Sequence, residues 1–154
     1  METSELSNRH ETNIYPAWLH SFVEIYQSLG VDNLELLDQI YHPQITFVDP
    51  AHQVEGIVNL RRYFKNLYTN LESCTFKIDN VFYQNNQAAI YWTMQYKHPK
   101  LNSGKVVTVE GHSTIQGTGS LITYHRDYLD LGAMLYEQVP LFGRVISFLK
   151  ARMN

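Results

Sequence analysis

The amino-acid sequence predicts an α+β domain, in which a cone-shaped, curved antiparallel sheet wraps around N-terminal helices and encloses an apolar pocket. Two observations predict this class. Segments with helical spacing of apolar residues extend to about residue 71, and three or four longer strand-like segments then follow, separated by short turn-like sequences. Aromatic residues are 13% of the 154 residues, a share that favours a cavity or interface lined by rings.

The first two helices are predicted from apolar spacing and from the residues that begin and end them. Pro16 suits a first helical turn, and Gly30 is expected to end the first helix. Its apolar residues are Trp18, Phe22, Ile25, Tyr26 and Leu29. A short second helix is expected between Asp32, which has capping-box spacing to Glu35, and Pro43. Its apolar stripe is Leu34, Leu37, Ile40 and Tyr41.

A short strand and a third helix are expected next. Residues 45–50, with the sequence Ile-Thr-Phe-Val-Asp-Pro, are rich in β-branched and aromatic types, which favours a strand. Pro50 would confine that strand to a sheet edge or end it. An amphipathic helix is expected from Gly56 to about Leu71. Its apolar side carries Leu60, Phe64, Leu67 and Leu71.

The longer strands are expected to form consecutive hairpins. Their ranges are 75–83, 87–97, 105–116 and 121–131. The segments between them are short and rich in Asn, Gly, Ser and Pro, as hairpin turns are. Alternation along the second and third of these strands predicts an inner set of side chains. That set is Ile90, Trp92, Met94, Tyr96, Val107, Val109, Gly111, Ser113 and Ile115.

Two terminal segments flank the expected domain of residues 14–138. Residues 1–13 are polar and predict a flexible tail. Residues 139–154 predict an amphipathic helix that begins at Pro140 and carries Arg144, Lys150 and Arg152 beside a broad apolar face. Packing of this helix on its own domain or on a twin subunit is the favoured interpretation. Weak peripheral contact with a membrane is the alternative.

Composition argues against several classes of protein. The net charge of −3 gives no reason to expect a nucleic-acid partner, because duplex binding needs clustered cations. Cys74 is the only cysteine, and the seven histidines show no metal-ligand spacing, so no disulfide, metal or cofactor is expected. The first thirteen residues lack the apolar stretch of a secretory signal, which predicts a cytoplasmic protein.

Two aspartates are the candidate chemical groups. Asp49 shares a strand face with Ile45 and Phe47, although an Asx-turn at the start of a loop would equally explain an Asp before Pro. Alternation places Asp127 on the same face as His125, but it does not say which face is inside. Two carboxylates in an apolar cavity disfavour each other's ionised forms, so such a pair can supply an acid and a base.

The order of elements over residues 16–138 resembles the SnoaL-like, or nuclear transport factor 2-like, superfamily, which includes ketosteroid isomerases, polyketide cyclases and limonene epoxide hydrolases. Residues 47–50, Phe-Val-Asp-Pro, are similar to the isomerase segment that holds the general base, which implies that role for Asp49. Residues 125–130, His-Arg-Asp-Tyr-Leu-Asp, resemble the end of the epoxide hydrolase sheet, which implies a catalytic acid at Asp127. Both comparisons imply that the two carboxylates face inward.

The sequence departs from both enzyme types at their partner residues. Phe22 stands where the isomerases carry an oxyanion-stabilising Tyr, with Tyr26 one turn later, and Gly111 stands near their protonated Asp. Met94 and Tyr96 stand near the Arg-x-Asp positions of the epoxide hydrolases, so Asp49 would have to replace their water-activating Asp. A complete site of either type is therefore not expected.

The resulting prediction is a small enzyme that uses Asp49 and Asp127 for acid–base chemistry of isomerase, cyclase or hydrolase type on a hydrophobic small molecule, without a cofactor. The expected substrate-binding residues are Trp18, Phe22, Tyr26, His52, Trp92, Met94, Tyr96, Gly111 and His125. His52 or His125 could replace either carboxylate, because imidazole exchanges protons near neutral pH. The alternative is a ligand-binding or protein-interaction domain without catalysis. A homodimer through the polar and aromatic outer sheet face is expected.

Overall fold

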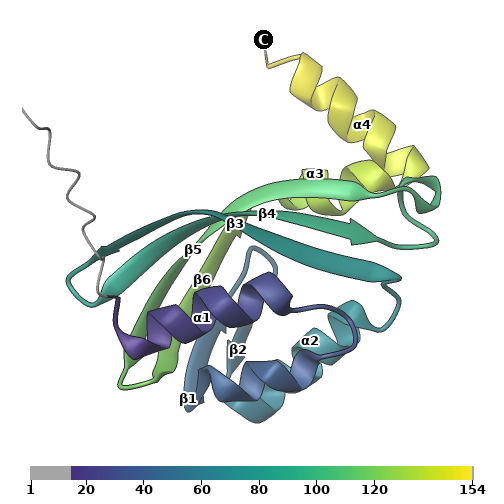
Figure 1. Cartoon of the computed structure of the whole chain (residues 1–154). Helices are drawn as coiled ribbons and strands as arrows, with labels where there is room; N and C mark the ends of the chain where they lie inside the picture. The colour runs from purple at the N-terminus through teal and green to yellow at the C-terminus, as the bar shows by residue number, and fades with distance from the viewer. Residues whose placement is uncertain (1–14, 154) are drawn as a thin grey trace, which may run out of the picture.

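The computed structural model describes residues 15–153, and the predicted tail over residues 1–13 lies outside these described residues. One six-stranded sheet has the strand order β2-β1-β6-β5-β4-β3. Its strands are β1 (Tyr41–Val48), β2 (Gln53–Glu55), β3 (Ser73–Gln84), β4 (Gln87–Lys97), β5 (Val107–Thr118) and β6 (Leu121–Leu129). The sheet arches over the helices α1 (Ala17–Ser28) and α2 (Ile57–Tyr68), which cover its concave face (Figure 1).

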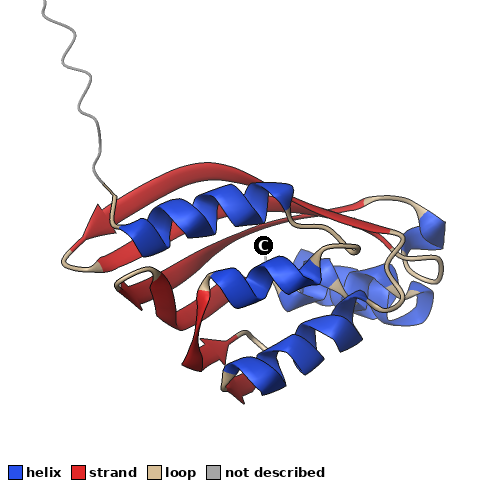
Figure 2. Cartoon of the chain, turned by 60° about the horizontal axis from the view of Figure 1, so that its bottom comes forward, coloured by secondary structure: helices blue, strands red, loops and turns tan. Residues whose placement is uncertain are grey.

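The predicted α+β class, with helices packed against a curved sheet, is confirmed. Strands β3 to β6 form three consecutive antiparallel hairpin pairs, as expected. The two strands β1 and β6, however, pair in parallel, with Phe47 opposite His125. The sheet is therefore mixed rather than wholly antiparallel, and it stays open at β2 and β3. In Figure 2 helix α1, which follows the grey segment, lies in front of the strands.

The prediction was wrong between residues 34 and 43, whereas the strand expected at residues 45–50 is present, begins earlier and ends at Val48. A 3₁₀ helix, η1 (Leu34–Gln39), replaces the expected α-helix, and Tyr41 begins β1 instead of ending a helix. The backbone N–H of Ile122 donates to the carbonyl of Ile40, so pairing with β6 overrides the local helical pattern. Pro43 does not end the element because it lies in a shift of register, where the ladder needs no N–H donor. Strand β1 is interior and ends at Val48, before Pro50, so of the two effects expected of that proline the structure shows an ended strand and not an edge strand.

Other boundaries differ by a few residues. Helix α2 ends at Tyr68, short of Leu71, and Leu67 is exposed although it was expected on the apolar side. Strand β4 has the predicted bounds and β3 extends beyond its own at both ends. Strand β5 begins and ends two residues later than expected, and β6 ends earlier. The short elements were not predicted. They are β2, η2 (Asn102–Gly104), α3 (Leu131–Met134) and η3 (Tyr136–Gln138).

The core lies between α1 and the concave face of the sheet. The buried residues of α1 lie on one face of the helix, with Phe22 three and four positions after the first two and Tyr26 four positions later. They are Trp18, Leu19, Phe22 and Tyr26. Trp18 packs directly on Gly117 of β5, where an added Cβ would overlap the Trp18 ring. The predicted inner side chains of β4, from Ile90 to Tyr96, are buried, so their facing is confirmed.

The last helix, α4 (Pro140–Ala151), begins at the predicted proline and projects away from the sheet beyond α3 (Figure 1). Its main neighbour is η3, and Gly143 is its only buried residue. Within residues 15–153, no helix is both long and apolar enough to cross a membrane.

Candidate functional site

A cavity of about 390 Å³ lies between the concave face of the sheet and the helices α2 and α3. Most of its wall is apolar, with Phe47, Phe64, Leu67, Leu71, Phe76, Trp92, Met94, Leu129, Leu131, Met134 and Leu135 among the lining residues. Its polar lining residues include Tyr26, Asp49, His52, Tyr63, Tyr68, Tyr96, Ser113 and Asp127. The size and composition are those of a small-molecule site, in which a few polar groups orient an apolar ligand.

Asp127 on β6 lines the cavity, and residues of the sheet hold one of its two carboxylate oxygens. Ser113 lies opposite it on β5, and the Ser113 Oγ–H donates to Asp127 Oδ1 at 2.5 Å. The Nε2 of His125, two residues away on the same strand face, is 2.6 Å from the same oxygen. The structure gives Oδ2 of Asp127 no hydrogen bond from any residue between 15 and 153. Asp127, which lines the cavity, therefore has one anchored oxygen and one oxygen without a hydrogen-bond partner among these residues.

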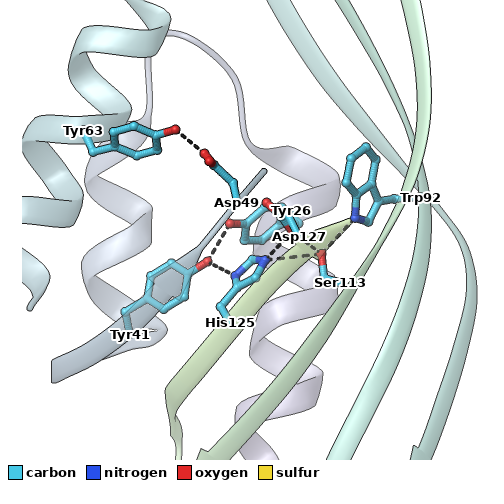
Figure 3. Close-up of polar contacts among 8 residues, drawn as sticks. All are labelled: Tyr26, Tyr41, Asp49, Tyr63, Trp92, Ser113, His125 and Asp127. Carbon is cyan, nitrogen blue, oxygen red and sulfur yellow. Dashed lines mark hydrogen bonds and ion pairs between the residues drawn. The ribbon is translucent and has the colours of Figure 1, made fainter. Parts of the chain in front are cut away.

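A chain of buried polar groups extends from Asp127 to the first helix (Figure 3). His125 Nδ1 is 2.7 Å from the Tyr41 hydroxyl, which in turn is 2.6 Å from the Tyr26 hydroxyl. Trp92 Nε1–H donates to Ser113 Oγ at 2.9 Å on the other side of Asp127. Every buried side-chain nitrogen and oxygen among the described residues has a partner, as a stable buried network requires.

The two tyrosines at the end of this chain remain neutral in the folded protein. Burial is the main cause that raises the pKa of both Tyr26 and Tyr41 well above the ordinary value. The negative charge of Asp127 raises both pKa values further. Their hydroxyls therefore keep their protons, so each can still donate one hydrogen bond within the chain.

Asp49 immediately follows β1 and caps a tight turn. Its Oδ1 accepts backbone hydrogen bonds from Ala51 at 2.8 Å and His52 at 2.7 Å, which is the Asx-turn arrangement expected of an Asp before Pro. Its Oδ2 accepts a hydrogen bond from the Tyr63 hydroxyl of α2. Asp49 also lines the cavity. The Asx-turn and the inward orientation of this carboxylate, which were considered as alternatives, therefore occur together. Both of its oxygens already have partners.

Tyr63 connects the two carboxylates electrostatically. Burial raises the pKa of Tyr63 most, followed by its hydrogen bond to Asp49 and then by the charges of Asp49 and Asp127. The Tyr63 oxygen is also 3.2 Å from Nδ1 of His52, whose side chain is 59% exposed and so lies at the cavity mouth. The hydroxyl of Tyr63 on α2 is therefore neutral, and the charges of both carboxylates contribute to its raised pKa.

A family model described as the SnoaL-like domain matches residues 22–125, which is more than half of the chain. This chain belongs to the SnoaL-like domain family. The matched range contains most of α1, the sheet up to His125, and the turn that holds Asp49. No curated protein matches the sequence.

Solved structures similar to this SnoaL-like protein share its fold at low sequence identity. A protein designated a SnoaL-like polyketide cyclase from Jannaschia sp. CCS1 superposes with a TM-score of 0.70 at 13% identity, over 80% of this chain and 92% of its own. A protein with a ketosteroid isomerase-like fold from Catenulispora acidiphila, solved in complex with trimethylamine, gives a TM-score of 0.68 at 16% identity, over 81% of this chain and 95% of its own. TerC, co-crystallised with polyporic acid, gives 0.63 at 13%, over 76% and 92%.

Seven of the eleven residues that the sequence predicted for the site line the cavity of this SnoaL-like protein. These are Tyr26, Asp49, His52, Trp92, Met94, Tyr96 and Asp127. The other four lie outside its lining. Trp18 and Phe22 are buried in the core, and His125 lies behind Asp127 with 1% of its surface exposed. Gly111 is covered by the Trp92 ring, because an added Cβ would overlap that ring.

Three residues of the site were not predicted in their roles. Tyr41 was assigned to a helix, Tyr63 was not distinguished from the rest of α2, and Ser113 was placed only as a polar interruption of an apolar strand face. Only Ser113 carried a usable signal, since a hydroxyl on an inward face requires a hydrogen-bond partner. The contacts of Tyr41 and Tyr63 are long-range, so local sequence did not reveal them.

The described part of the chain contains no group of three or more His, Cys, Asp or Glu side chains positioned to hold a metal ion. Cys74 is buried near the Tyr68 hydroxyl, and burial raises the pKa of its thiol to about 11. This cysteine is therefore a weak nucleophile, and the polar groups available for chemistry at the cavity are carboxylates, hydroxyls and imidazoles.

Proposed function

We propose that this protein is a small-molecule enzyme that transfers protons on a hydrophobic substrate, with the Asp127 carboxylate as the acid–base group. The observation that carries the proposal is the asymmetry of Asp127. Ser113 and His125 bind Oδ1, whereas Oδ2 has no hydrogen-bond partner among residues 15–153, and Asp127 lines a mostly apolar cavity. A general base needs a free lone pair held in a fixed direction within reach of the substrate.

The proposed reaction conserves protons within the site. Asp127 Oδ2 takes a proton from one atom of the substrate, and the resulting carboxylic acid returns it to another atom of the same molecule. His125 and Ser113 act as positioning residues, since both hold the other oxygen of the carboxylate and His125 does not line the cavity. No oxidant or reductant is required, which suits an isomerisation or an intramolecular cyclisation.

Asp49 and Tyr63 have a different part in this proposal. Because both oxygens of Asp49 are already bonded, its main effect is to orient the Tyr63 hydroxyl on the opposite wall. The raised pKa of Tyr63 keeps that hydroxyl neutral. Its one proton is donated to Asp49, so towards the substrate the Tyr63 oxygen can accept a hydrogen bond. The prediction that both aspartates share the chemistry is thereby refined to one acid–base group and one orienting pair.

The substrate class follows from the cavity wall. A volume of about 390 Å³ with rings from Phe47, Phe76 and Trp92 favours a compact hydrophobic molecule with one or two polar groups. The similar proteins designated as a polyketide cyclase and co-crystallised with polyporic acid support a ring-containing substrate. The proposed substrate class is therefore a compact, ring-containing hydrophobic molecule with one or two polar groups.

A second candidate is a binding protein without catalysis. Gly111, Met94 and Tyr96 stand where the related enzymes carry oxyanion donors or an Arg-x-Asp pair, and this observation favours binding alone. Both candidates require the same cavity. They differ in whether a bound molecule changes chemically.

The test begins with native mass spectrometry of purified protein to find a bound compound. The released compound is incubated with fresh wild-type protein and with the Asp127→Asn variant, and both mixtures are compared by NMR, which also detects an isomer of unchanged mass. The amide introduced by Asp127→Asn can keep the hydrogen bonds at the anchored oxygen, so binding should persist. Conversion by the wild type and at least about 100-fold slower conversion by the variant is expected. Binding without any chemical change in either protein would establish the second candidate instead.

A further inference from the structure

Helix α4 exposes an unusually large share of its apolar side chains. Leu141 is 73% exposed and Met153, just beyond the helix, is 85% exposed. Four more exposed apolar residues lie between them: Phe142, Val145, Phe148 and Leu149. Exposed apolar residues that form a continuous patch, rather than single positions, mark a surface that contacts another phase or molecule.

These side chains form one continuous face of the helix. At 100° per residue, positions 141, 142, 145, 148, 149 and 153 span an arc of about 140°. The opposite side holds the contacts with the domain, where Gly143 packs on η3 and Ile146 lies 3.9 Å from the Cβ position of Gly132. The helix is thus attached along one side and uncovered along the other, and in Figure 1 it projects into open space.

The charges around this face are all positive. Residues 139–153 contain Arg144, Lys150 and Arg152 and no Asp or Glu. Lys150 is neutralised by ion pairs with Asp130 at 2.8 Å and Glu137 at 2.7 Å, which fasten the helix to the domain. Arg144 has no ion pair among the described residues, and Arg152 lies over the Phe148 ring at 5.2 Å. Two cations without an ion pair among residues 15–153 therefore accompany the apolar face.

This charge pattern argues against a second copy of the chain as the occupant. A symmetric dimer would place the same face on itself, bringing arginines together without any acidic residue in the segment to pair with them. An anionic bilayer surface satisfies both features, since it accepts apolar side chains at the headgroup boundary and attracts basic residues. Phe142 and Phe148 suit that boundary.

The position of α4 also links it to the cavity. Helix α3, on which Ile146 packs, contributes Leu131 and Met134 to the cavity wall, and Leu135 follows them. The Tyr96 hydroxyl of β4 donates to the Met134 carbonyl, so this wall is tied to the sheet. A surface that holds α4 would therefore hold one wall of the cavity close to it.

We propose that α4 docks this protein on anionic membrane surfaces, with its apolar face in the headgroup boundary and the α3 wall of the cavity beside the bilayer. Docking of this kind would let a hydrophobic molecule pass between the lipid phase and the cavity. The docking itself does not depend on the proposed acid–base function, because vesicle binding is measured without turnover.

The test is co-sedimentation of the purified full chain with two sets of vesicles, one of phosphatidylcholine alone and one that also contains phosphatidylglycerol. The wild type is expected to sediment with the anionic vesicles and more weakly with the neutral ones. The double variant Phe142→Ser/Phe148→Ser should lose at least about tenfold in partitioning, since two rings no longer enter the boundary. Arg144→Gln/Arg152→Gln should lose roughly 30-fold on anionic vesicles and little on neutral ones.

Matched controls separate docking from misfolding and from dimerisation. Phe82→Ser and Arg62→Gln alter an exposed ring and an exposed cation elsewhere and should sediment as the wild type does. Light scattering in the absence of vesicles gives the mass of every variant. Wild-type protein that stays in the supernatant with both vesicle sets would overturn the proposal, as would unchanged sedimentation of the variant that lacks the two rings. A third outcome would also overturn it: the wild type is a dimer that does not bind vesicles, and the variant that lacks the two rings is a monomer. A second copy of the chain would then cover the apolar face.

Discussion

Asp127 and Asp49 differ in which of their oxygens are already bonded, and this difference decides the role that each is given. Asp127 is held at Oδ1 by a residue of its own strand and by Ser113 on the neighbouring strand. Asp49 has donors on both oxygens. At this scale the most sensitive position is His125, since it contacts both Asp127 and Tyr41 from a fully buried site.

The variant His125→Phe should lower the free energy of unfolding by about 2 kcal/mol, because it removes one partner from a part-buried carboxylate and one from a buried hydroxyl. Urea denaturation measures the change. His112→Phe is the matched control, since His112 stacks between Tyr91 and Tyr128 on the outer sheet face and makes no comparable buried hydrogen bond. Equal stability of the two variants would contradict the importance of the network.

Sequence reasoning found Asp127 and His125 because they are two residues apart on a strand, where alternation places them on one face. Alternation alone did not show which face of the strand points inward, because the residues on the other face are equally typical of strands. Those residues are Tyr124, Arg126 and Tyr128. The resemblance to known families supplied that choice. The partner Tyr41 is 84 residues away from His125, so no local pattern relates them.

Among the elements, β5 is shaped by two aromatic rings that lie across it. Gly117 makes room for Trp18 of α1, and Gly111 makes room for Trp92 of β4. Neither glycine has a positive φ, so close approach, and not backbone conformation, explains the absence of a side chain. Trp92 can therefore lie flat in the cavity wall while its Nε1–H reaches Ser113.

Gly111→Ala should displace the Trp92 ring and cost roughly 1–3 kcal/mol of stability through overpacking. It should also weaken the Trp92–Ser113 hydrogen bond and change the tryptophan emission spectrum. Urea denaturation monitored by fluorescence records both effects. Gly30→Ala serves as the control, because an added Cβ there meets nothing closer than 3.8 Å and should change the stability by less than about 0.5 kcal/mol. A neutral Gly111→Ala variant would show that the ring is free to move.

The sequence was most informative for elements whose local pattern agrees with their tertiary contacts. Strand β4 alternates cleanly and has its predicted bounds. Residues 34–43 failed because Leu37, Ile40 and Tyr41 have a spacing compatible with a helix, while the backbone at Ile40 and Tyr41 pairs with β6 far along the chain. The short element α3 was missed because four residues give no readable periodicity.

For the molecule as a whole, buried tyrosines make folding dependent on pH at the alkaline end. Burial raises the pKa of Tyr26, Tyr41, Tyr63 and Tyr68 well above the ordinary value of 10.0. Burial also raises the pKa of Tyr96 to about 12. Because the folded state disfavours their ionised form, these groups contribute stability that is complete below pH 10 and is lost as the pH rises further.

In a spectrophotometric titration, the buried tyrosines are therefore expected to ionise only above about pH 10 and together with loss of the circular dichroism signal. Urea denaturation at a series of pH values should give stability that declines only above about pH 10. A single phase near about pH 10 with retained structure would contradict the burial of these side chains.

The α+β class and the helix-covered sheet could be predicted from the order of elements, since helices followed by hairpins leave few other packings. The parallel pairing of β1 with β6 could not, because those strands are joined through the whole remainder of the sheet. The homodimer through the outer face around Tyr91 and His112, and the cytoplasmic location, stay predictions. Light scattering and cell fractionation would test them.

The central claim is that Asp127 presents a reactive oxygen to an apolar cavity. Its most direct test uses 5-nitrobenzisoxazole, a compact aromatic probe: a base removes its ring C–H proton, the N–O bond breaks, and a coloured phenolate nitrile forms. The account predicts a rate above that of buffer, reduced about 100-fold by Asp127→Asn, less by Asp49→Asn, and not by Asp79→Asn on the outer face. If the probe quenches Trp92 fluorescence, and so enters the cavity, yet the wild type and Asp127→Asn react equally fast, the claim is contradicted.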